Sequence, residues 1–515
     1  MCRLFGSRLL FLILVTWVPL LLAQSLPSPA DSVTYDDEFG VRTQMDPQSS
    51  MSRSYLPVQD FRVSQLPNPQ AMPAKAKRLS LQEAIALSLR NNPNVIIAEL
   101  TRITDKFGLE TSIHDTYNVQ WQPLTLSGTL INGATPVWAA GTQAGVTAVS
   151  GTQVTIQHTD NLLGGMGVNT INLTQPLLQN YGAEYNRIIY QNAFDTEANA
   201  KLSFKSSVIT AVVGVITAYR TLIQDYNNIE VSKQSYESQK AGVLQTELQV
   251  RVGKIAPSEL IQQQENLETV HLQLVQQEQQ LNNDYQAFLT ALGFAPTAKF
   301  IIDRSLKVEE KKLPSLDECI KVGLKNNIAY QQALIQLRIT KRALITAENA
   351  RKWTLNVTST VQMGSQRSAA GQPLIDKGTN PNLGISLSVP FDNVDLKSAV
   401  VSAKIAIENA ELTLAQTKAS LISQILNQWE TVSNQHVQVI ISERAVAMQK
   451  KALENAQIQL KYGKVSMFEV NGLVNDLLTG ETGLISEQVG YLNSITTLYQ
   501  TLGTTLEKWH IKLRY

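Results

Sequence analysis

The chain has 515 residues, enough for a large core, and it is 43% hydrophobic, 17% charged and only 6% aromatic. This composition suits long helices better than a compact enzyme. The formal net charge of +1 excludes a general affinity for nucleic acid. The five histidines are scattered without metal-ligand spacing, so we expect no metal, no cofactor and no enzymatic activity.

The N-terminus predicts a secretory signal peptide over residues 1–24. Two arginines precede an apolar run from Leu9 to Leu22, and small residues follow it. A retained anchor is the alternative, but the run is short for a spanning helix. Residues 25–77 are rich in Pro and Ser and lack sustained periodicity, which is typical of a flexible extension.

No later apolar run reaches the length of a spanning helix. The nearest, VITAVVGVITA at 208–218, fits the buried face of a helix. An exported chain of this kind would have to enter a membrane as a β-barrel. Cys319 is the only cysteine after the predicted signal peptide, and we expect it to be a small buried residue.

Two similar segments open two halves of the chain. SLQEAIALSLRNNPNV at 80–95 resembles SLDECIKVGLKNNIAY at 315–330, and each begins with a Ser and a Glu three residues apart. That spacing is a capping box, which starts a helix. We therefore predict a first repeat over 78–300 and a second over 315–505, with a linker at 301–314 and a C-terminal segment at 506–515.

Each half then changes to a period of two, which indicates strands. The alternating segments are YNVQWQPLTLSG (117–128), GVNTINLTQP (167–176), WTLNVTSTVQMG (353–364) and NLGISLSVP (382–390). They predict β-hairpins at about 117–176 and 353–390, with strands near the length that crosses a bilayer. Residues 145–158 also alternate and could add a strand, but we interpret 129–167 as a long loop. An ordinary soluble sheet is the alternative.

Aromatic side chains and prolines mark these hairpins. The candidate anchors at a membrane interface are Tyr117, Trp121, Trp138 and Trp353. Pro176 and Pro390 end the last strand of each half, where proline suits a transition from strand to helix. Simple edge prolines are the alternative. After the first transition, a helix is predicted from near 177 to 249.

VRVGKIAPSELIQ at 250–262 interrupts this helical pattern. Its Gly-Lys pair suggests a phosphate loop, but the second glycine and the Ser or Thr that such a loop needs are absent. Glycine permits the left-handed conformation that ends a helix, and Pro257 suits the first turn of the next. We predict a hairpin tip near 253; a mid-helix kink is the alternative.

The tip and the helix after it recur in the second half. VGKIAPSEL at 252–260 aligns with YGKVSMFEV at 462–470, which predicts a second tip near 463. Both are followed by heptads, which predict coiled-coil helices near 257–293 and 467–503. The heptad residues are Leu260, Leu267, Leu274, Leu281 and Phe288, and then Val470, Leu477, Leu484, Tyr491 and Leu498.

Four strands cannot close a barrel by themselves, because about eight is the smallest workable number. An open edge in lipid would leave backbone groups unpaired, at several kcal/mol each. If these strands contact lipid, several chains must therefore contribute to one barrel.

With its paired openings, two strand hairpins with following prolines and two glycine-centred tips, the sequence resembles the TolC family of outer-membrane efflux proteins over about residues 78–505. The resemblance implies a homotrimer with a twelve-stranded β-barrel in outer-membrane lipid, continued by a long α-helical barrel across the periplasm. It implies the exit duct of a tripartite efflux pump or type I secretion system, with a periplasmic adaptor and an inner-membrane transporter as partners.

The resemblance also implies roles for residues near the tips. Adaptor docking would involve Gly253, Lys254, Ser258, Gly463, Lys464 and Ser466. The channel constriction would involve Glu259 and Glu469, with Asp476 as a weaker candidate. Threefold symmetry would turn each acid into a ring that favours cations. The alternative is that these are solvated acids that stabilise a helix N-terminus.

One rival function remains: an exported coiled-coil scaffold or surface interaction protein without transport activity. A scaffold has no need for strands of bilayer length with small polar residues on one face, whereas a duct needs that face to line its lumen. The sequence does not indicate the transported substrate.

Overall fold

The computed structural model describes residues 77–131, 135–161, 167–305, 313–367, 373–391 and 393–513. The predicted signal peptide and residues 25–76 of the predicted extension lie outside them, as do the side chains of Tyr117 and Trp138. Lys77, the last residue of the predicted extension, begins a short strand.

The first half contains two short paired strands, a pair of helices, four strands and a long helical hairpin. In chain order these are β1 (Lys77–Leu79), α3 (Leu81–Asn91), α4 (Pro93–Tyr117), β2 (Gln120–Ile131), β3 (Thr135–Thr147), β4 (Gln153–Asn161), β5 (Val168–Pro176), α5 (Ala183–Asn186), α6 (Ile188–Arg251), α7 (Pro257–Leu292) and β6 (Phe300–Ile302). Strands β1 and β6 pair in parallel.

The second half follows a similar order with two strands in place of four. Its elements are α8 (Leu316–Asn326), α9 (Ile328–Ala350), β7 (Thr354–Arg367), β8 (Pro373–Ser388), α10 (Val394–Lys461), α11 (Met467–Leu502) and α12 (Thr505–Lys508). The return helices α7 and α11 agree with the helices predicted near 257–293 and 467–503.

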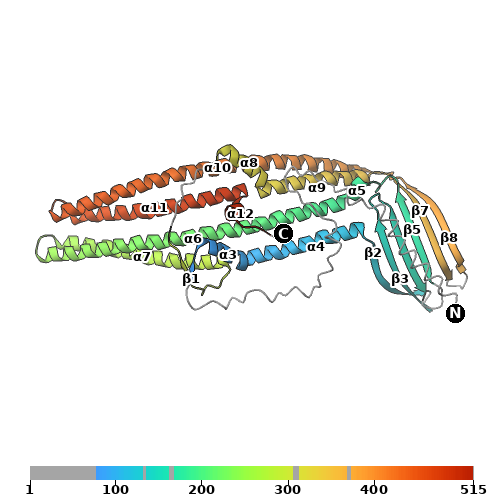
Figure 1. Cartoon of the computed structure of the whole chain (residues 1–515), viewed down its shortest axis with the longest axis horizontal. Coiled ribbons are helices and arrows are strands. Elements are labelled where there is room, and N and C mark those ends of the chain that lie inside the picture. Colours follow the sequence, from blue (N-terminus) through green and yellow to red (C-terminus); the bar gives the residue numbers. More distant parts are fainter. Residues whose placement is uncertain are drawn as a thin grey trace. The chain divides into compact units, whose positions relative to one another are not determined.

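The helices of both halves run alongside one another, with the sheet at one end and the two hairpin tips at the other (Figure 1). Helix α6 packs against α7 toward its tip and against α4 toward the sheet, and α10 packs against α11 and α9 in the same way. Helices α9 and α11 also contact α6, so the two halves form one layer in the order α4, α6, α9, α10 near the sheet.

The first long helix is shorter than predicted. Helix α6 has 64 residues, about 96 Å at ~1.5 Å per residue, and it begins at Ile188 instead of near 177. Residues 177–187 instead form an irregular junction in which Asn180 and Gly182 have φ values of 64° and 102°. Two residues with positive φ so close together cannot belong to a right-handed α-helix.

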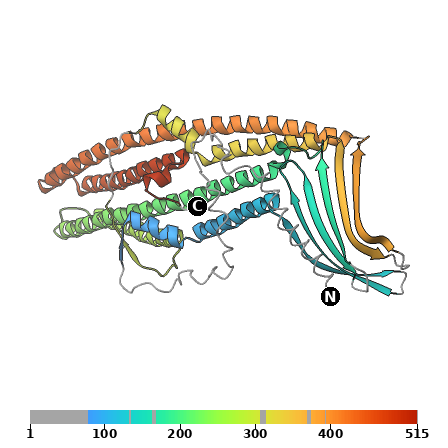
Figure 2. The ribbon, with the colours of Figure 1, turned by 45° about the vertical axis from the view of Figure 1, so that its right-hand side comes forward.

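The main sheet has six antiparallel strands in the order β2-β3-β4-β5-β7-β8. The prediction of a loop over 129–167 is therefore wrong, because β3 and β4 form a further hairpin within that segment. The Gly, Thr and Ser content of these strands obscured their alternation. Figure 2 shows the strands bending and twisting together, as sheets of L-residues do.

The apolar core lies where the short first helix of each half, α3 or α8, packs on the helical hairpin of the same half. Val208, Ile209, Val212, Val215 and Ile216 are buried, which confirms the buried helix face predicted at 208–218. Of the described helices, only the stretch Ala183–Arg251 is long and apolar enough to cross a membrane, and 44% of its apolar window is buried in the molecule. Cys319 is buried, as predicted.

Candidate functional site

The six-stranded sheet has one apolar and one polar face. Residues directly opposite one another in an antiparallel sheet point to the same side. One row across all six strands is entirely apolar: Pro381, Val361, Ile171, Ile156, Ala144 and Trp121. The row on one side of it is polar or small: Asn382, Thr360, Asn172, Thr155, Gly145 and Gln120. The row on its other side is polar: Asn380, Gln362, Thr170, Gln157, Gln143 and Gln122.

The apolar face is uncovered at both edges of the sheet. On β8, Leu383 and Ile385 are each 75% exposed, and on β2, Trp121 is 69% exposed. Along β7 the positions of this face run from Leu355 to Met363 and are apolar except for Ser359, over about 26 Å at ~3.3 Å per residue. That height is close to the apolar band of transmembrane β-barrels, roughly 25 Å.

Polar side chains end the apolar band away from the helices. On β4 the next two positions of the same face are His158 and Asp160, whose Nε2 and Oδ2 atoms lie 3.0 Å apart. At the helical end, Trp353 is 54% exposed just before β7, where an aromatic anchor was predicted. From its far end toward the helices, this face is first polar, then apolar, and then carries an exposed tryptophan. The same order of side chains is found across a bilayer and its interface.

The junction between sheet and helices is held by side-chain amides. Asn180 and Asn349 bond reciprocally, through Asn180 N to Asn349 Oδ1 at 3.0 Å and Asn349 Nδ2 to Asn180 Oδ1 at 2.9 Å. The predicted transition prolines lie nearby in sequence: Pro176 is the buried last residue of β5, and Pro390 lies between β8 and α10. The interlocked amides fix the irregular segment that follows Pro176.

The two hairpin tips have the same backbone geometry. Gly253 and Gly463 have φ values of 72° and 69°, in the left-handed region that favours glycine. The following amide bonds back to the helix in both, from Lys254 N to Gln249 O at 2.8 Å and from Lys464 N to Gln459 O at 3.0 Å. Each is a Schellman motif that ends a helix, so a mid-helix kink is excluded at both places.

The predicted site residues gather at these tips on exposed surface. Gly253, Lys254 and Ser258 lie at the first tip and Gly463, Lys464 and Ser466 at the second. Ser466 caps α11 by accepting a bond from Glu469 N at 3.2 Å. Glu259 and Glu469 occupy the first turns of α7 and α11, and Asp476 is exposed two turns further along α11. In the described chain all three acids are exposed to solvent.

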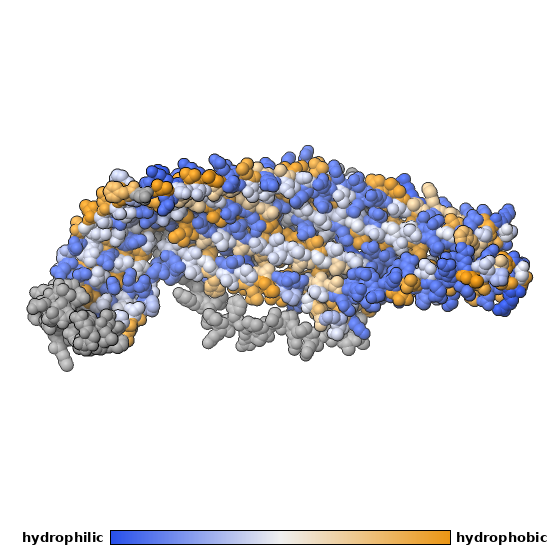
Figure 3. All heavy atoms as spheres, turned by 180° about the vertical axis from the view of Figure 1, so that it is seen from behind, coloured by the Kyte–Doolittle hydropathy of each residue, from blue (hydrophilic) through white to orange (hydrophobic). Residues whose placement is uncertain are grey.

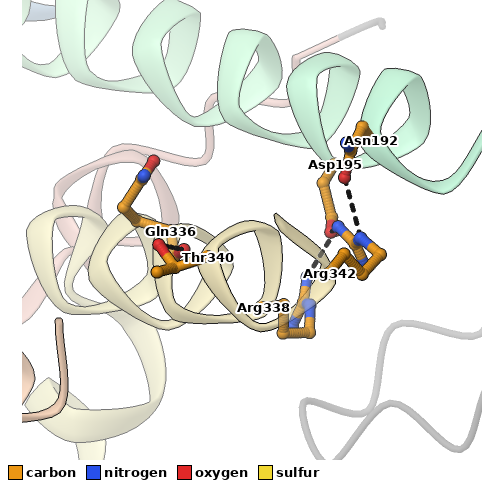
Figure 4. Close-up of polar contacts among 6 residues, drawn as sticks. All are labelled: Asn192, Asp195, Gln336, Arg338, Thr340 and Arg342. Atoms are coloured by element: carbon orange, nitrogen blue, oxygen red, sulfur yellow. Dashed lines mark hydrogen bonds and ion pairs between the residues drawn. The ribbon is translucent and has the colours of Figure 1, made fainter. Parts of the chain in front are cut away.

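A buried ion-pair cluster joins α6 to α9. Asp195 of α6 accepts hydrogen bonds from Arg338 Nη2 at 2.7 Å and from Arg342 Nη2, and Arg342 Nε donates to Asn192 Oδ1 at 2.8 Å (Figure 4). The side chain of Asp195 is 6% exposed. Sequence reasoning missed this cluster, because nothing in the sequence spacing aligns two helices nearly 150 residues apart.

A second ion pair holds α4 to the same helix two residues further along α6. Arg102 pairs with Glu197, which also accepts an ion pair from Lys201 Nζ at 3.0 Å. Helix α6 is thus tied to α4 on one side and to α9 on the other by neighbouring acids. The pairs are buried, so each fixes the relative position of two helices more than it adds stability.

Toward the tips, the contact between α6 and α11 is polar. Ser232, Ser235, Gln239 and Thr246 of α6 are buried on one face. Gln239 Nε2 donates to Asn475 Oδ1 at 3.2 Å, and a further amide pair joins Gln263 of α7 to Asn471 of α11. The two hairpins therefore meet through uncharged polar groups near the tips. Nearer the sheet they meet through Arg220 of α6, whose Nη1 donates to Leu492 O at 2.7 Å and to Thr496 Oγ1 at 2.8 Å.

A carboxylate pair lies between α6 and α7. Burial, and after it the contact with Asp284, together raise the pKa of Asp225 to about 7. Gln280 Nε2 donates to Asp284 Oδ2 at 2.9 Å, which holds that carboxylate in place. Among the described residues, no group of three or more His, Cys, Asp or Glu side chains is arranged to hold a metal ion.

The sequence matches no protein-family profile and no curated protein sequence. The fold, however, matches solved outer membrane channels. The CmeC channel of Campylobacter jejuni aligns with a TM-score of 0.63 at 16% identity, over 82% of this chain and 86% of that one. VceC of Vibrio cholerae aligns at 0.61 and 16% identity, over 82% and 96% of the two chains.

The open state of the MtrE outer membrane channel of Neisseria gonorrhoeae also aligns, with a TM-score of 0.61 at 13% identity over 83% of this chain and 89% of that one. The chain therefore has the fold of these outer membrane channels. The resemblance to the TolC family is confirmed at the level of the fold.

Proposed function

We propose that the chain is the outer-membrane exit duct of a tripartite efflux pump or a type I secretion system. The observation that carries the proposal is the row of six apolar residues between two polar rows, because a channel wall needs a lipid face and a water face at the same depth. The sheet would cross the outer membrane, and the helices would extend into the periplasm.

The working unit in this proposal is a homotrimer. Both edge strands, β2 and β8, have unpaired backbone groups beside exposed apolar side chains, which lipid does not tolerate. Pairing with other copies removes both edges. The same proposal keeps the division into repeats at 78–300 and 315–505, which the matching tip geometries favour.

The tips are the proposed docking site of a periplasmic adaptor, with an inner-membrane transporter as the energy source. Figure 3 shows that the surface away from the sheet is mostly hydrophilic on one side, with scattered hydrophobic side chains. Phe468 and Tyr462 beside the second tip are 62% and 76% exposed. Exposed aromatic side chains among lysines suit a protein partner.

The scaffold alternative is disfavoured by the exposed apolar band, which would make a water-soluble scaffold aggregate. The two functions also differ in what the polar face does. In a duct the polar face lines a lumen through which water and ions pass, whereas in a scaffold it lines no conducting path.

Single-channel recording of the purified protein in a planar bilayer tests the proposal, with Glu259→Ala plus Glu469→Ala as the paired variant. We expect a discrete conductance whose preference for cations falls in the double variant. A discrete conductance that is unchanged in the variant would keep the duct and remove the constriction. A folded protein that never inserts into membranes would favour the scaffold.

A further inference from the structure

The extra hairpin β3–β4 has a consequence for how copies of the chain join, and this consequence rests on the proposed function above. Its two strands lie inside the sheet, between β2 and β5, and pair along both edges. They carry the same alternation as their neighbours: Ile156 and Ala144 face the apolar side, and Gln157 and Gln143 face the polar side. The hairpin is therefore a full part of the two-faced wall.

The turn of this hairpin is locked into the junction at the helical end. Gly182 N donates to Ser150 O at 3.1 Å, and Thr152 Oγ1 donates to Gln175 Oε1 at 2.5 Å. Gly151 has a φ of 93°, and a Cβ there would overlap the carbonyl oxygen of Asn180. A hairpin that lay outside the barrel wall would not need these close contacts between its turn and the segment that joins the sheet to the helices.

The edges of the sheet coincide with the edges of the helical layer. Helix α4 is the outer helix on one side and leads directly into β2, whereas β8 leads directly into α10, the outer helix on the other side. Both outer helices bear exposed apolar stripes at helical spacing. These are Ile97, Leu100 and Phe107 on α4, and Val394, Val401, Ile405 and Leu412 on α10.

Strand direction allows the two edges to meet. Strand β2 runs away from the helices and β8 runs back toward them, so β8 of one copy beside β2 of the next is an antiparallel pair. This strand pairing also places the apolar stripe of α10 in one copy beside the apolar stripe of α4 in the next copy. Apolar positions on both edge strands face the same side, so the pairing continues the apolar band without a break.

We propose that copies of this chain join through β8 and the β2 of a second copy, so that three copies with six strands each close a barrel of eighteen strands. The twelve-stranded barrel implied by the resemblance would require four strands per chain. Either β3 and β4 would lie outside the wall and β2 would pair with β5 of the same chain, or β2 and β3 would lie outside it and β8 would pair with β4 of another copy. Barrel diameter grows roughly linearly with strand number, and barrels of 16–18 strands hold an open aqueous channel.

Disulfide cross-linking distinguishes the two closures. In a Cys319→Ser background, Ser386→Cys on the polar face of β8 is combined in turn with Gln122→Cys, Thr125→Cys or Ser127→Cys on β2. The matched controls combine Ser386→Cys with Thr155→Cys, Gln157→Cys or Thr159→Cys on β4. A third set, without the Ser386 change, combines each β2 cysteine with Asn172→Cys on the polar face of β5, which is separated from β2 by β3 and β4 in the six-stranded sheet. The full-length protein in outer membranes is treated with a mild oxidant and resolved on a denaturing gel, because a disulfide forms only where Cα atoms approach within about 7 Å.

At least one combination of β8 with β2 is expected to give covalent trimer at tenfold or greater excess over every β4 combination, and no combination of β2 with β5 is expected to give an intrachain disulfide. An intrachain disulfide between β2 and β5 would overturn the eighteen-stranded closure. Covalent trimer from a β4 combination would overturn the eighteen-stranded closure while leaving the exit duct intact. Membrane-inserted oligomer without cross-links from any combination would also overturn the proposed edge pairing. Protein absent from the membrane would contradict the proposed function itself.

Discussion

Asn92 and Asn327 make the same two hydrogen bonds in the two halves of the chain. The Oδ1 atom of each caps the helix that follows, accepting from Asn94 N at 2.9 Å and Tyr330 N at 3.0 Å. The Nδ2 atom of each donates to the last turn of a return helix, to Ala291 O at 2.8 Å and Thr501 O at 2.9 Å. Each asparagine thus joins the end of one helix to the start of another.

We expect Asn92→Ala and Asn327→Ala each to lower the free energy of unfolding by ~1–2 kcal/mol, because each removes a helix cap and a hydrogen bond to the last turn of a return helix. The midpoint of urea unfolding measures this loss. Asn94→Ala is the matched control, since Asn94 is exposed and next to the same cap. A control that lost as much as Asn92→Ala would contradict the assigned role.

The tip glycines give a second prediction. Gly253→Ala and Gly463→Ala should each destabilise the protein by about 1 kcal/mol, because alanine disfavours the left-handed conformation at both tips. Gly472→Ala should act in the opposite direction and stabilise α11 by roughly 0.5–1 kcal/mol, since a Cβ there meets nothing within 4 Å. The thermal unfolding midpoints of the three variants measure these effects. Equal changes of the midpoint in the same direction for all three would contradict the left-handed role of the tip glycines.

Asp225 gives a prediction about pH. Its pKa is raised to about 7 in the folded protein from its ordinary value of 3.8, so the folded state binds the proton more tightly than the unfolded state does. The stabilisation from its protonated form is therefore complete below pH 3.8 and is lost as pH rises to about 7. Because the group is half exposed, we expect Asp225→Asn to stabilise the protein by only about 1 kcal/mol at pH 8.

Urea unfolding at pH 5 and pH 8 measures this effect. The gain from Asp225→Asn should be larger at pH 8 than at pH 5, whereas the exposed Asp476→Asn should give no such difference. A gain that was larger at pH 5 would show that Asp225 is charged in the folded protein and stabilised there.

The ion-pair cluster of Figure 4 predicts a loss that depends on which partner is removed. Asp195→Ala leaves Arg342, which is 11% exposed, without its carboxylate, and should cost about 3 kcal/mol. Arg338→Ala should cost much less, because Arg338 is 39% exposed and Asp195 keeps Arg342. Equal losses in chemical unfolding would indicate that the two arginines are equivalent partners.

Local patterns predicted the helical part of the molecule well. Each return helix has its own heptads, and each tip depends on one glycine and the residues beside it. The interactions that determine these elements therefore join residues close together in the sequence. The contacts of Asn92 with Ala291 and of Asn327 with Thr501 explain why the Asn-Asn and Leu-Gly segments recur together. Their pairing, however, could be known only once the chain had folded back over about 200 residues.

The sheet was predicted less completely. The alternation of β7 and β8 is strong because Leu383 and Ile385 stand between small residues, whereas β3 is rich in Ala and Gly and has little contrast between its faces. The ion pairs of Asp195 and Glu197 could not be predicted either. They depend on the alignment of three helices, which is set by the junction around Asn180 and Asn349.

The most direct test of the channel wall compares two adjacent residues of β7 in a planar bilayer. Thr358→Cys and Val357→Cys, each in a Cys319→Ser background, are exposed to a charged, membrane-impermeant thiol reagent while single-channel current is recorded. Thr358 is on the polar face and Val357 on the apolar face, so we predict a stepwise fall in current for Thr358→Cys and no change for Val357→Cys. Equal responses from the two positions, or a response from Val357→Cys alone, would contradict a sheet with water on its polar face and lipid on its apolar face.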